Sequence, residues 1–148
     1  MIYHYFSTIL RFQESLQERE RPISEFCDLC SEYISDKQFI YNSSTFSFDI
    51  TARDRTKDSS KIELADLSSG EKQIVSLFSH LYLSGTSRFF VLIDEPELSL
   101  SVPWQRRLLP DIMRGQFYAG VVAVTHSPFI YDNELKSYAR SLGEFIVH

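Results

Sequence analysis

Residues 89–97 read FFVLIDEPE, a run of five apolar residues that passes directly into acidic ones. Burial of apolar side chains is favourable, whereas burial of carboxylates is costly unless their charge is compensated. The run has no polar alternation, which is typical of a strand covered on both faces in a parallel sheet. We therefore expect Asp94 and Glu95 to end such a strand and to handle a cation or a water there.

A second apolar run, AGVVAVTHS at residues 119–127, has the same character. The segment between the two runs, residues 102–115, predicts a crossover helix that Pro110 bends or interrupts. Right-handed crossovers make successive strands parallel, and ligands bind beyond the carboxyl ends of such strands. Thr125 and His126 are thus predicted to share one sheet edge with the two acids. A solvated strand end and a hydrogen-bonded, partly buried histidine are the simpler alternatives for each feature alone.

The rest of the C-terminal half continues the same alternation. Residues 132–142, DNELKSYARSL, predict another helix, and residues 144–148, EFIVH, predict the opening of a third strand. Strands that alternate with helices indicate an α/β layer fold.

The N-terminal part predicts two helices and a small antiparallel sheet. Apolar residues recur at helical spacing in residues 2–17 and again in residues 23–34, and the charged segment QERERP separates the two. From about residue 38 the period changes to two, and the face of segment 45–52 that is apolar carries Phe46, Phe48 and Ile50. With the polar turn RDRTKDSS and the alternating KIELADL after it, this pattern predicts a β-hairpin or a small meander.

The segment LSSGEKQ, residues 67–73, predicts the start of a helix. Ser68 and Ser69 are good capping residues, and Gly70 allows close approach of the backbone. Gly85 is expected to end this helix, whose apolar face carries Ile74, Leu77, Phe78 and Leu81. Free backbone N–H groups and the positive end of the helix dipole suit an anion such as phosphate. An ordinary N-cap is the simpler alternative.

The chain has 148 residues, enough for a hydrophobic core, and a net charge of −5. That charge argues against a strongly basic nucleic-acid surface. Solvated charge is the simpler interpretation of the local basic groups, which are Arg53, Arg55, Lys57, Lys61, Arg106, Arg107 and Arg114. No apolar run approaches the roughly 18 residues that span a bilayer, so no membrane partner is expected.

Cys27 and Cys30 are spaced C-x-x-C within a segment of helical character. A zinc site needs a second pair of ligands, and a redox pair usually lies between a strand and a helix. Packing cysteines in a reducing compartment are the favoured interpretation, and a cytoplasmic location is expected.

The order of the motifs, "LSSGEKQ", then "FFVLIDEPELSLSVPWQ", then "VVAVTHSP", resembles the second half of an ABC-type ATPase. It is most similar to the branch that includes the SMC, RecF and OLD-like ATPases, and within it to ATPases of anti-phage defence islands, such as the Septu-type and retron-associated ones. The resemblance implies a partial P-loop NTPase fold. It divides the chain into a helical segment at residues 1–37 and an ATPase half at residues 38–148.

The resemblance also implies roles for individual residues, with ATP and Mg²⁺ as cofactors. Asp94, in the motif that resembles Walker B, would hold Mg²⁺ through water, and Glu95 would be the general base. His126 would contact the γ-phosphate as the switch histidine. The signature motif, which would bind a nucleotide held by a second subunit, comprises Ser68, Ser69, Gly70 and Glu71. The D-loop, which would lie across a dimer seam, comprises Leu98, Ser99, Leu100 and Ser101.

No G-x-x-x-x-G-K-[ST] motif occurs in these 148 residues, so the Walker A phosphate cradle of the family is absent from them. The chain therefore resembles a C-terminal fragment, a truncated product or one piece of a split ATPase, and we expect it not to hydrolyse ATP alone. The expected partners are a second copy or a P-loop-bearing half, with a nuclease and DNA as further partners that the family implies. A non-catalytic remnant that serves a partner ATPase or nuclease as an interaction module is the alternative function.

Overall fold

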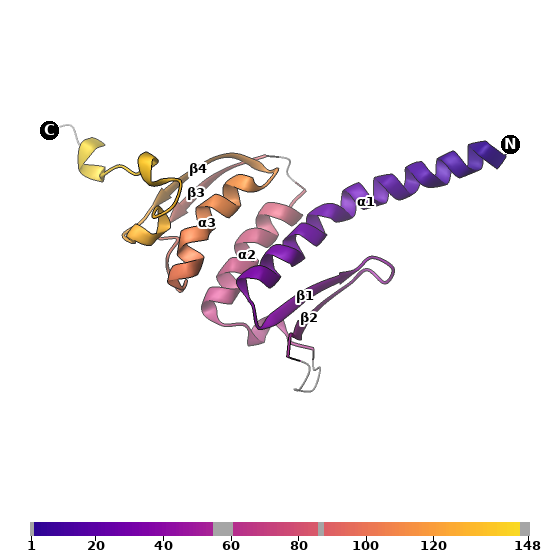
Figure 1. The fold of residues 1–148 in the computed structure, drawn as a ribbon, viewed down its shortest axis with the longest axis horizontal. Coiled ribbons are helices and arrows are strands. Elements are labelled where there is room, and N and C mark those ends of the chain that lie inside the picture. Colours follow the sequence, from indigo (N-terminus) through magenta and orange to yellow (C-terminus); the bar gives the residue numbers. More distant parts are fainter. Residues whose placement is uncertain (1, 55–60, 86–87, 146–148) are drawn as a thin grey trace. The chain divides into compact units, whose positions relative to one another are not determined.

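The computed structural model describes residues 2–54, 61–85 and 88–145, and the chain forms two compact units, Met1–Gly85 and Thr86–His148. Each unit combines helices with one two-stranded sheet, antiparallel in the first unit and parallel in the second (Figure 1). The predicted α/β class is confirmed.

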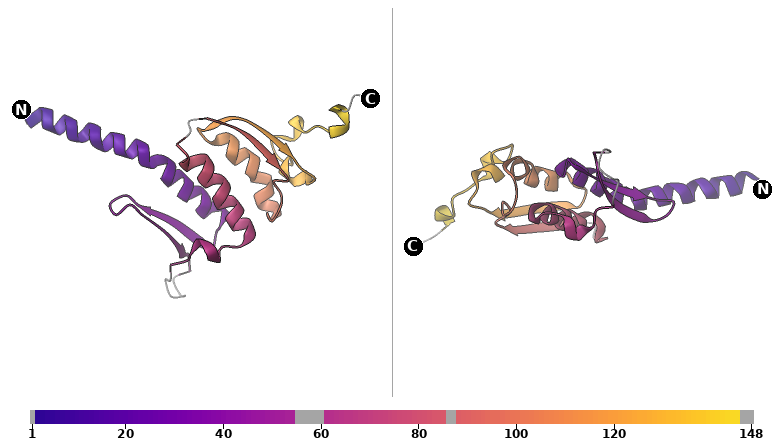
Figure 2. Two further views of the ribbon diagram at one scale, coloured as in Figure 1. Left: turned by 180° about the vertical axis from the view of Figure 1, so that it is seen from behind. Right: turned by 90° about the horizontal axis from the view of Figure 1, so that it is seen from below.

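The first unit consists of the helices α1 (Ile2–Tyr33) and α2 (Ser69–Leu83) and the strands β1 (Lys37–Asn42) and β2 (Ser47–Ala52). α1 lies alongside α2, as the left view of Figure 2 shows, and it also packs on β1. Phe78 is fully buried, and its ring lies 5.7 Å from that of Tyr33. The core of this unit is thus built between the second half of α1, the apolar face of α2 and the hairpin.

The predicted interruption of the first helix is wrong, because α1 runs without a break through Pro22. A proline removes one helical hydrogen bond and clashes with the carbonyl four residues earlier. The flanking glutamates and arginines are good helix formers, and an ion pair of 2.7 Å between Arg21 and Glu25 spans the proline. Beyond it, Phe26 and Cys30 anchor the helix in the core.

Both cysteines are buried free thiols on α1, as the interpretation of packing residues requires. Burial raises the pKa of Cys27 to about 11 and that of Cys30 to about 12. Since the thiolate is the reactive form, these side chains are inert packing groups near neutral pH.

β1 and β2 form the predicted hairpin, in which Phe39 pairs with Ile50 and both side chains are buried. Phe46 is not part of the predicted apolar face: it lies in the turn with φ 51° and is 75% exposed. The third strand of a meander is reduced to one antiparallel bridge between Thr51 and Lys61. The 3-10 turn Leu64–Asp66 follows it. Most of the predicted polar turn, residues 55–60, lies outside the described residues.

The second unit contains β3 (Phe89–Asp94), α3 (Val102–Arg114) and β4 (Tyr118–Val124). β3 and β4 pair in parallel, as predicted, with Asp94 opposite Val124. α3 packs on β4 and continues through Pro110 without interruption. Its buried face carries Leu108, Leu109 and Ile112.

Of the two faces of the β3–β4 sheet, the described residues of the second unit cover only one. The uncovered face is apolar and carries Phe90, Leu92, Val122 and Val124, which are 65%, 74%, 51% and 41% exposed. The uninterrupted apolar runs predict burial on both faces in a complete sheet. Since the P-loop half of the family is absent from these residues, an uncovered apolar face is the expected result, and the described residues of this unit leave one.

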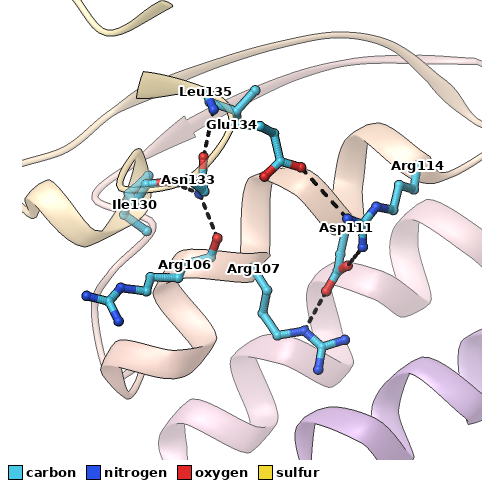
Figure 3. A network of polar contacts seen from close by, with 8 residues as sticks. All are labelled: Arg106, Arg107, Asp111, Arg114, Ile130, Asn133, Glu134 and Leu135. Atoms are coloured by element: carbon cyan, nitrogen blue, oxygen red, sulfur yellow. Dashed lines mark hydrogen bonds and ion pairs between the residues drawn. The ribbon is translucent and has the colours of Figure 1, made fainter. Parts of the chain in front are cut away.

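The predicted helix at residues 132–142 is wrong. Short 3-10 turns at Lys136–Tyr138 and Leu142–Phe145 take its place. The side chain of Asn133 accepts from the N–H of Leu135 and donates to the carbonyls of Arg106 and Ile130, as Figure 3 shows. Such side-chain bonds compete with helical backbone bonds. Of the predicted third strand, Glu144 and Phe145 lie in the last 3-10 turn, and residues 146–148 lie outside the described residues.

Within the described ranges, no helix combines the length and the apolar character that a membrane crossing needs.

Replacing Phe78 by alanine is expected to lower the free energy of unfolding of the first unit by about 3–5 kcal/mol, because a large ring is removed from a fully buried position. Urea unfolding followed by circular dichroism measures this. Leu64→Ala, at a position 54% exposed in the same unit, is the matched control and should change stability by less than about 0.5 kcal/mol. Equal losses for the two variants would contradict this description of the core.

Candidate active site

The carboxyl ends of β3 and β4 bring an acid and a histidine into contact. The N–H of Glu95 donates to the carbonyl of Val124 at 2.8 Å, which extends the parallel pairing by one step. Its carboxylate then lies 3.2 Å from Nε2 of His126. Asp94, the last residue of β3, is exposed at the same edge. The structure thus places the three residues that were expected to converge at one sheet edge.

The backbone at this edge is unusual. Glu95 has a φ of 49° and Ser99 a φ of 60°, both in the left-handed region that residues other than glycine rarely adopt. Such conformations persist only where the surrounding structure imposes them, and they are concentrated at functional sites. Here the Glu95 N–H bond to Val124 and the buried Pro96 fix the turn that aims the Glu95 side chain at His126.

Glu97 holds the turn that carries His126, a contact that the sequence analysis did not foresee. One carboxylate oxygen accepts from the backbone N–H of His126 at 2.8 Å and from that of Ser127 at 3.1 Å. The other accepts a short hydrogen bond from the hydroxyl of Thr125. Glu97 is part of the quoted stretch FFVLIDEPE, but only the fold shows which donors face it.

The pKa values of the two glutamates shift in opposite directions because of their surroundings. Burial alone would raise the pKa of Glu97, but the hydrogen bonds from Thr125 and from backbone N–H groups outweigh it and lower the pKa to about 2. The hydrogen bond to Glu97, together with burial, raises the pKa of Glu95, although the neighbouring His126 opposes this. Glu97 is therefore a fixed anion, whereas Glu95 is the better proton acceptor of the pair.

A second polar link runs through Gln105 on α3, which is 9% exposed. Its amide nitrogen donates to the carbonyl of Leu100 at 2.9 Å, and its amide oxygen accepts from the hydroxyl of Ser127 at 2.6 Å. The sequence does not reveal this role, since a glutamine in a helix gives no signal of the loops that it joins.

The segment that resembles a D-loop lies between Glu97 and α3. Leu98 is 61% exposed, whereas Leu100 is 7% exposed and anchors the segment from inside. Ser99 is exposed, and Ser101 precedes α3 as its N-terminal flanking residue. The segment therefore presents Leu98 and Ser99 outward from a fixed base.

The first unit contains the other predicted site, at the start of α2. Ser68 is the N-cap, as predicted, and forms a capping box with Glu71: its hydroxyl accepts from the N–H of Glu71 at 3.3 Å, and its own N–H donates to Glu71 at 2.7 Å. Ser68 and Ser69 are exposed, and Gly70 is buried. The two hydroxyls and the helix start are thus accessible to a ligand.

Glu71 is committed to contacts inside its own unit. Its second oxygen forms a 2.7 Å ion pair with Lys37 at the start of β1, and the side chains of the two residues are 11% and 15% exposed. Burial alone would raise the pKa of Glu71, but the hydrogen bonds from Lys37 and Ser68 lower it. The pair ties the start of α2 to the hairpin, and Lys37 is a further residue that the sequence analysis did not single out.

Among the described residues, no group of three or more histidines, cysteines, aspartates and glutamates is arranged to hold a metal ion. The exposed carboxylate of Asp94 nevertheless suits Mg²⁺, which keeps much of its water shell and takes one or two carboxylates together with phosphate oxygens. An exposed carboxylate at this edge is thus a ligand of the kind that such an ion takes.

The arginines of α3 are engaged in ion pairs within the second unit (Figure 3). Arg107 and Arg114 both contact Asp111, at 2.8 and 3.3 Å, and Asp111 is only 6% exposed. Arg106 pairs with Asp132 at 3.1 Å and lies over the ring of Phe129. The arginines therefore form ion pairs within the unit, which the interpretation as solvated charge did not include.

Comparisons with known proteins identify the class of the chain. Residues 5–132 match the model of a family described as "AAA domain, putative AbiEii toxin, Type IV TA system". Among solved structures, the chain is similar to one from a study of the ATP-driven dimerization and DNA-stimulated activation of SMC ATPases. The identity is 15% and the TM-score 0.43, over 78% of this chain and 75% of that one. No curated protein matches the sequence.

Because the family model spans most of its length, the chain belongs to this family of AAA domains. It is therefore a domain of the ATPase type.

We expect the Lys37–Glu71 pair to make the stability of the first unit depend on acid. The folded-state pKa of Glu71 is below its ordinary value of 4.5, so the unfolded chain binds a proton at a higher pH than the folded chain does. The contribution is therefore complete above pH 4.5 and is lost as the pH falls through the lower, folded-state value. Glu71→Gln should lower the stability of the unit near neutral pH. Below pH 4.5, the stability of this variant should fall less steeply than that of the original chain.

Thermal unfolding at a series of pH values measures this effect. Glu63→Gln, which changes an exposed glutamate of the same unit, is the control and should keep the acid dependence of the original chain. Parallel pH profiles for the original chain and Glu71→Gln would show that the ion pair contributes nothing to the linkage.

Proposed function

We propose that the chain is the C-terminal half of an ABC-type ATPase, which hydrolyses ATP when a P-loop-bearing half completes it. The observation that carries the proposal is the contact between Glu95 and His126 at the carboxyl ends of two parallel strands, beside the exposed Asp94. The carboxyl edge of a parallel sheet is where ligands bind in open α/β folds. Membership of a family of AAA domains supports the same reaction class.

Asp94 would hold Mg²⁺, mainly through water molecules. When bound with the nucleotide, the ion neutralises charge on the phosphates. This chain would present the carboxylate of Asp94 at a fixed position, because the pairing of β3 with β4 holds the backbone of Asp94 in place.

Glu95 would orient the attacking water and accept its proton. Its hydrogen bond to Glu97 raises its pKa, which makes it a better base than an unperturbed glutamate. His126, whose side chain is 86% exposed and 3.2 Å from Glu95, would reach the γ-phosphate from the neighbouring strand. Positioning and charge neutralisation are the main sources of rate in phosphoryl transfer.

Ser68, Ser69 and Gly70 would bind the γ-phosphate of a nucleotide held by a second subunit, through hydroxyls, backbone N–H groups and the positive end of the α2 dipole. Since both oxygens of Glu71 are engaged within the unit, its contribution to nucleotide binding would be to fix the start of the helix. Leu98 to Ser101 would lie across the seam between subunits.

The partner that we propose is a P-loop-bearing half or a second copy, which would cover the exposed apolar face of the β3–β4 sheet. A role in DNA processing or anti-phage defence, with a nuclease as a further partner, rests on the sequence resemblance. The family description, which names a putative toxin of a type IV toxin–antitoxin system, supports a defence setting. The second candidate function is a non-catalytic interaction module, which the same exposed face would serve.

Co-expression with a P-loop-bearing half from the neighbouring genes tests the proposal. We expect a complex that hydrolyses ATP, no hydrolysis by this chain alone, and a loss of turnover of at least about a hundredfold in Glu95→Gln, because the general base is removed. A malachite-green assay measures phosphate release. Glu134→Gln, an exposed glutamate in the same unit, is the control. Robust turnover by the pure chain that Glu95→Gln abolishes would overturn the proposed division, and a complex without turnover would favour the interaction module.

A separate prediction concerns the exposed apolar face of the β3–β4 sheet. Leu92→Glu adds a charge at the centre of the uncovered apolar face, at a position 74% exposed, and should abolish co-purification with the P-loop half without unfolding the chain. Leu142→Glu, at a position 65% exposed outside that face, is the control and should leave the complex intact. Co-purification of Leu92→Glu at the original level would show that the complex forms through another surface.

A further inference from the structure

We propose that Glu97 is a positioning residue of this ATPase site, which holds the His126 turn and joins it to the segment Leu98–Ser101. The inference rests on the proposed function for its catalytic meaning, but its structural part stands on the contacts of Glu97 alone. Three donors converge on one carboxylate: the hydroxyl of Thr125 and the backbone N–H groups of His126 and Ser127.

The exposure of His126 explains why such a residue is needed. Its side chain is 86% exposed, so packing cannot fix its direction. The contacts that orient it are the bond of its backbone N–H to Glu97, at 2.8 Å, and the contact of its ring with Glu95, at 3.2 Å. Hydrogen bonds to a charged acceptor are stronger than those to a neutral one, so Glu97 sets the point from which the ring projects.

Glu97 also begins the segment that faces outward. Its carbonyl accepts from the N–H of Leu100 at 3.0 Å, and the carbonyl of Leu100 accepts from Gln105, which in turn binds Ser127. Two independent polar links therefore connect this segment to the His126 turn. A displacement of Leu98 or Ser99 by a partner would move the turn, so that contact at this surface and the position of the histidine are coupled through Glu97.

Amide hydrogen exchange, measured by NMR on the chain alone, tests the structural part. In Glu97→Ala, the exchange rates of the His126 and Ser127 amides should rise about tenfold or more, because both lose their acceptor. In Glu97→Gln they should stay within about threefold of the original rates, because an amide oxygen still accepts both bonds and its NH₂ group faces the Thr125 hydroxyl. The amides of β4 should not change. Unchanged rates at both turn amides, or an equal rise throughout β4, would overturn the inference.

ATP turnover in the completed complex tests the positioning role. Glu97→Ala should lower kcat about tenfold or more with little change in KM, Glu97→Gln should restore most of it, and Glu134→Ala is the control. If Glu97 acts through the histidine, Glu97→Ala should cause no further loss in a His126→Ala background. Additive losses would overturn the positioning role. If the complex has no turnover even with the original chain, that result contradicts the proposed ATPase function. It does not affect the structural part of the inference, which the exchange experiment tests separately.

Discussion

The parallel pairing of β3 with β4 is the constraint on which the candidate active site depends. The pairing sets Asp94 opposite Val124, and the N–H of Glu95 continues it by one bond. A shift of one residue in this register would turn the side chains of one strand to the other face and separate Glu95 from His126. The apolar runs of the two strands thus determine where the acids and the histidine meet, although they contain none of these groups.

A negative charge is stabilised in a similar way at the two predicted sites. At each of them hydrogen-bond donors from a side chain and from the backbone keep a partly buried glutamate ionised: Thr125 and the turn after β4 do so for Glu97, and Lys37 and the N–H of Ser68 do so for Glu71. An ionised carboxylate that accepts several hydrogen bonds rigidifies the segment that offers them. In both cases the neighbours that these bonds hold, His126 and Ser68, have exposed side chains, so the glutamate fixes the backbone from which an accessible polar group projects.

The sequence alone predicted the structure correctly where the local pattern and the burial of the side chains agree. The N-cap of α2 at Ser68 follows from capping chemistry, and the two strand ends follow from uninterrupted apolar runs. Prediction failed where a distant contact decides the local structure. Asn133 bonds to the carbonyls of Arg106 and Ile130 and prevents a helix that its own segment favours, and α1 continues through Pro22 because residues beyond it are anchored in a core. Glu97 was visible in the sequence, but its three donors come from residues 28 to 30 positions later.

The exposed face of the β3–β4 sheet connects the architecture with the proposed division of labour. The sequence of β3 is apolar at every position before Asp94, whereas a strand with one solvated face would normally alternate with polar residues. Phe90 and Leu92 are nevertheless largely exposed among the described residues. Water contact with such a surface is unfavourable by roughly 25 cal/mol for each Å². A partner that covers this face therefore gains binding free energy on the sheet whose carboxyl edge carries Asp94. The same apolar contact would drive both the assembly of the complex and the completion of the site.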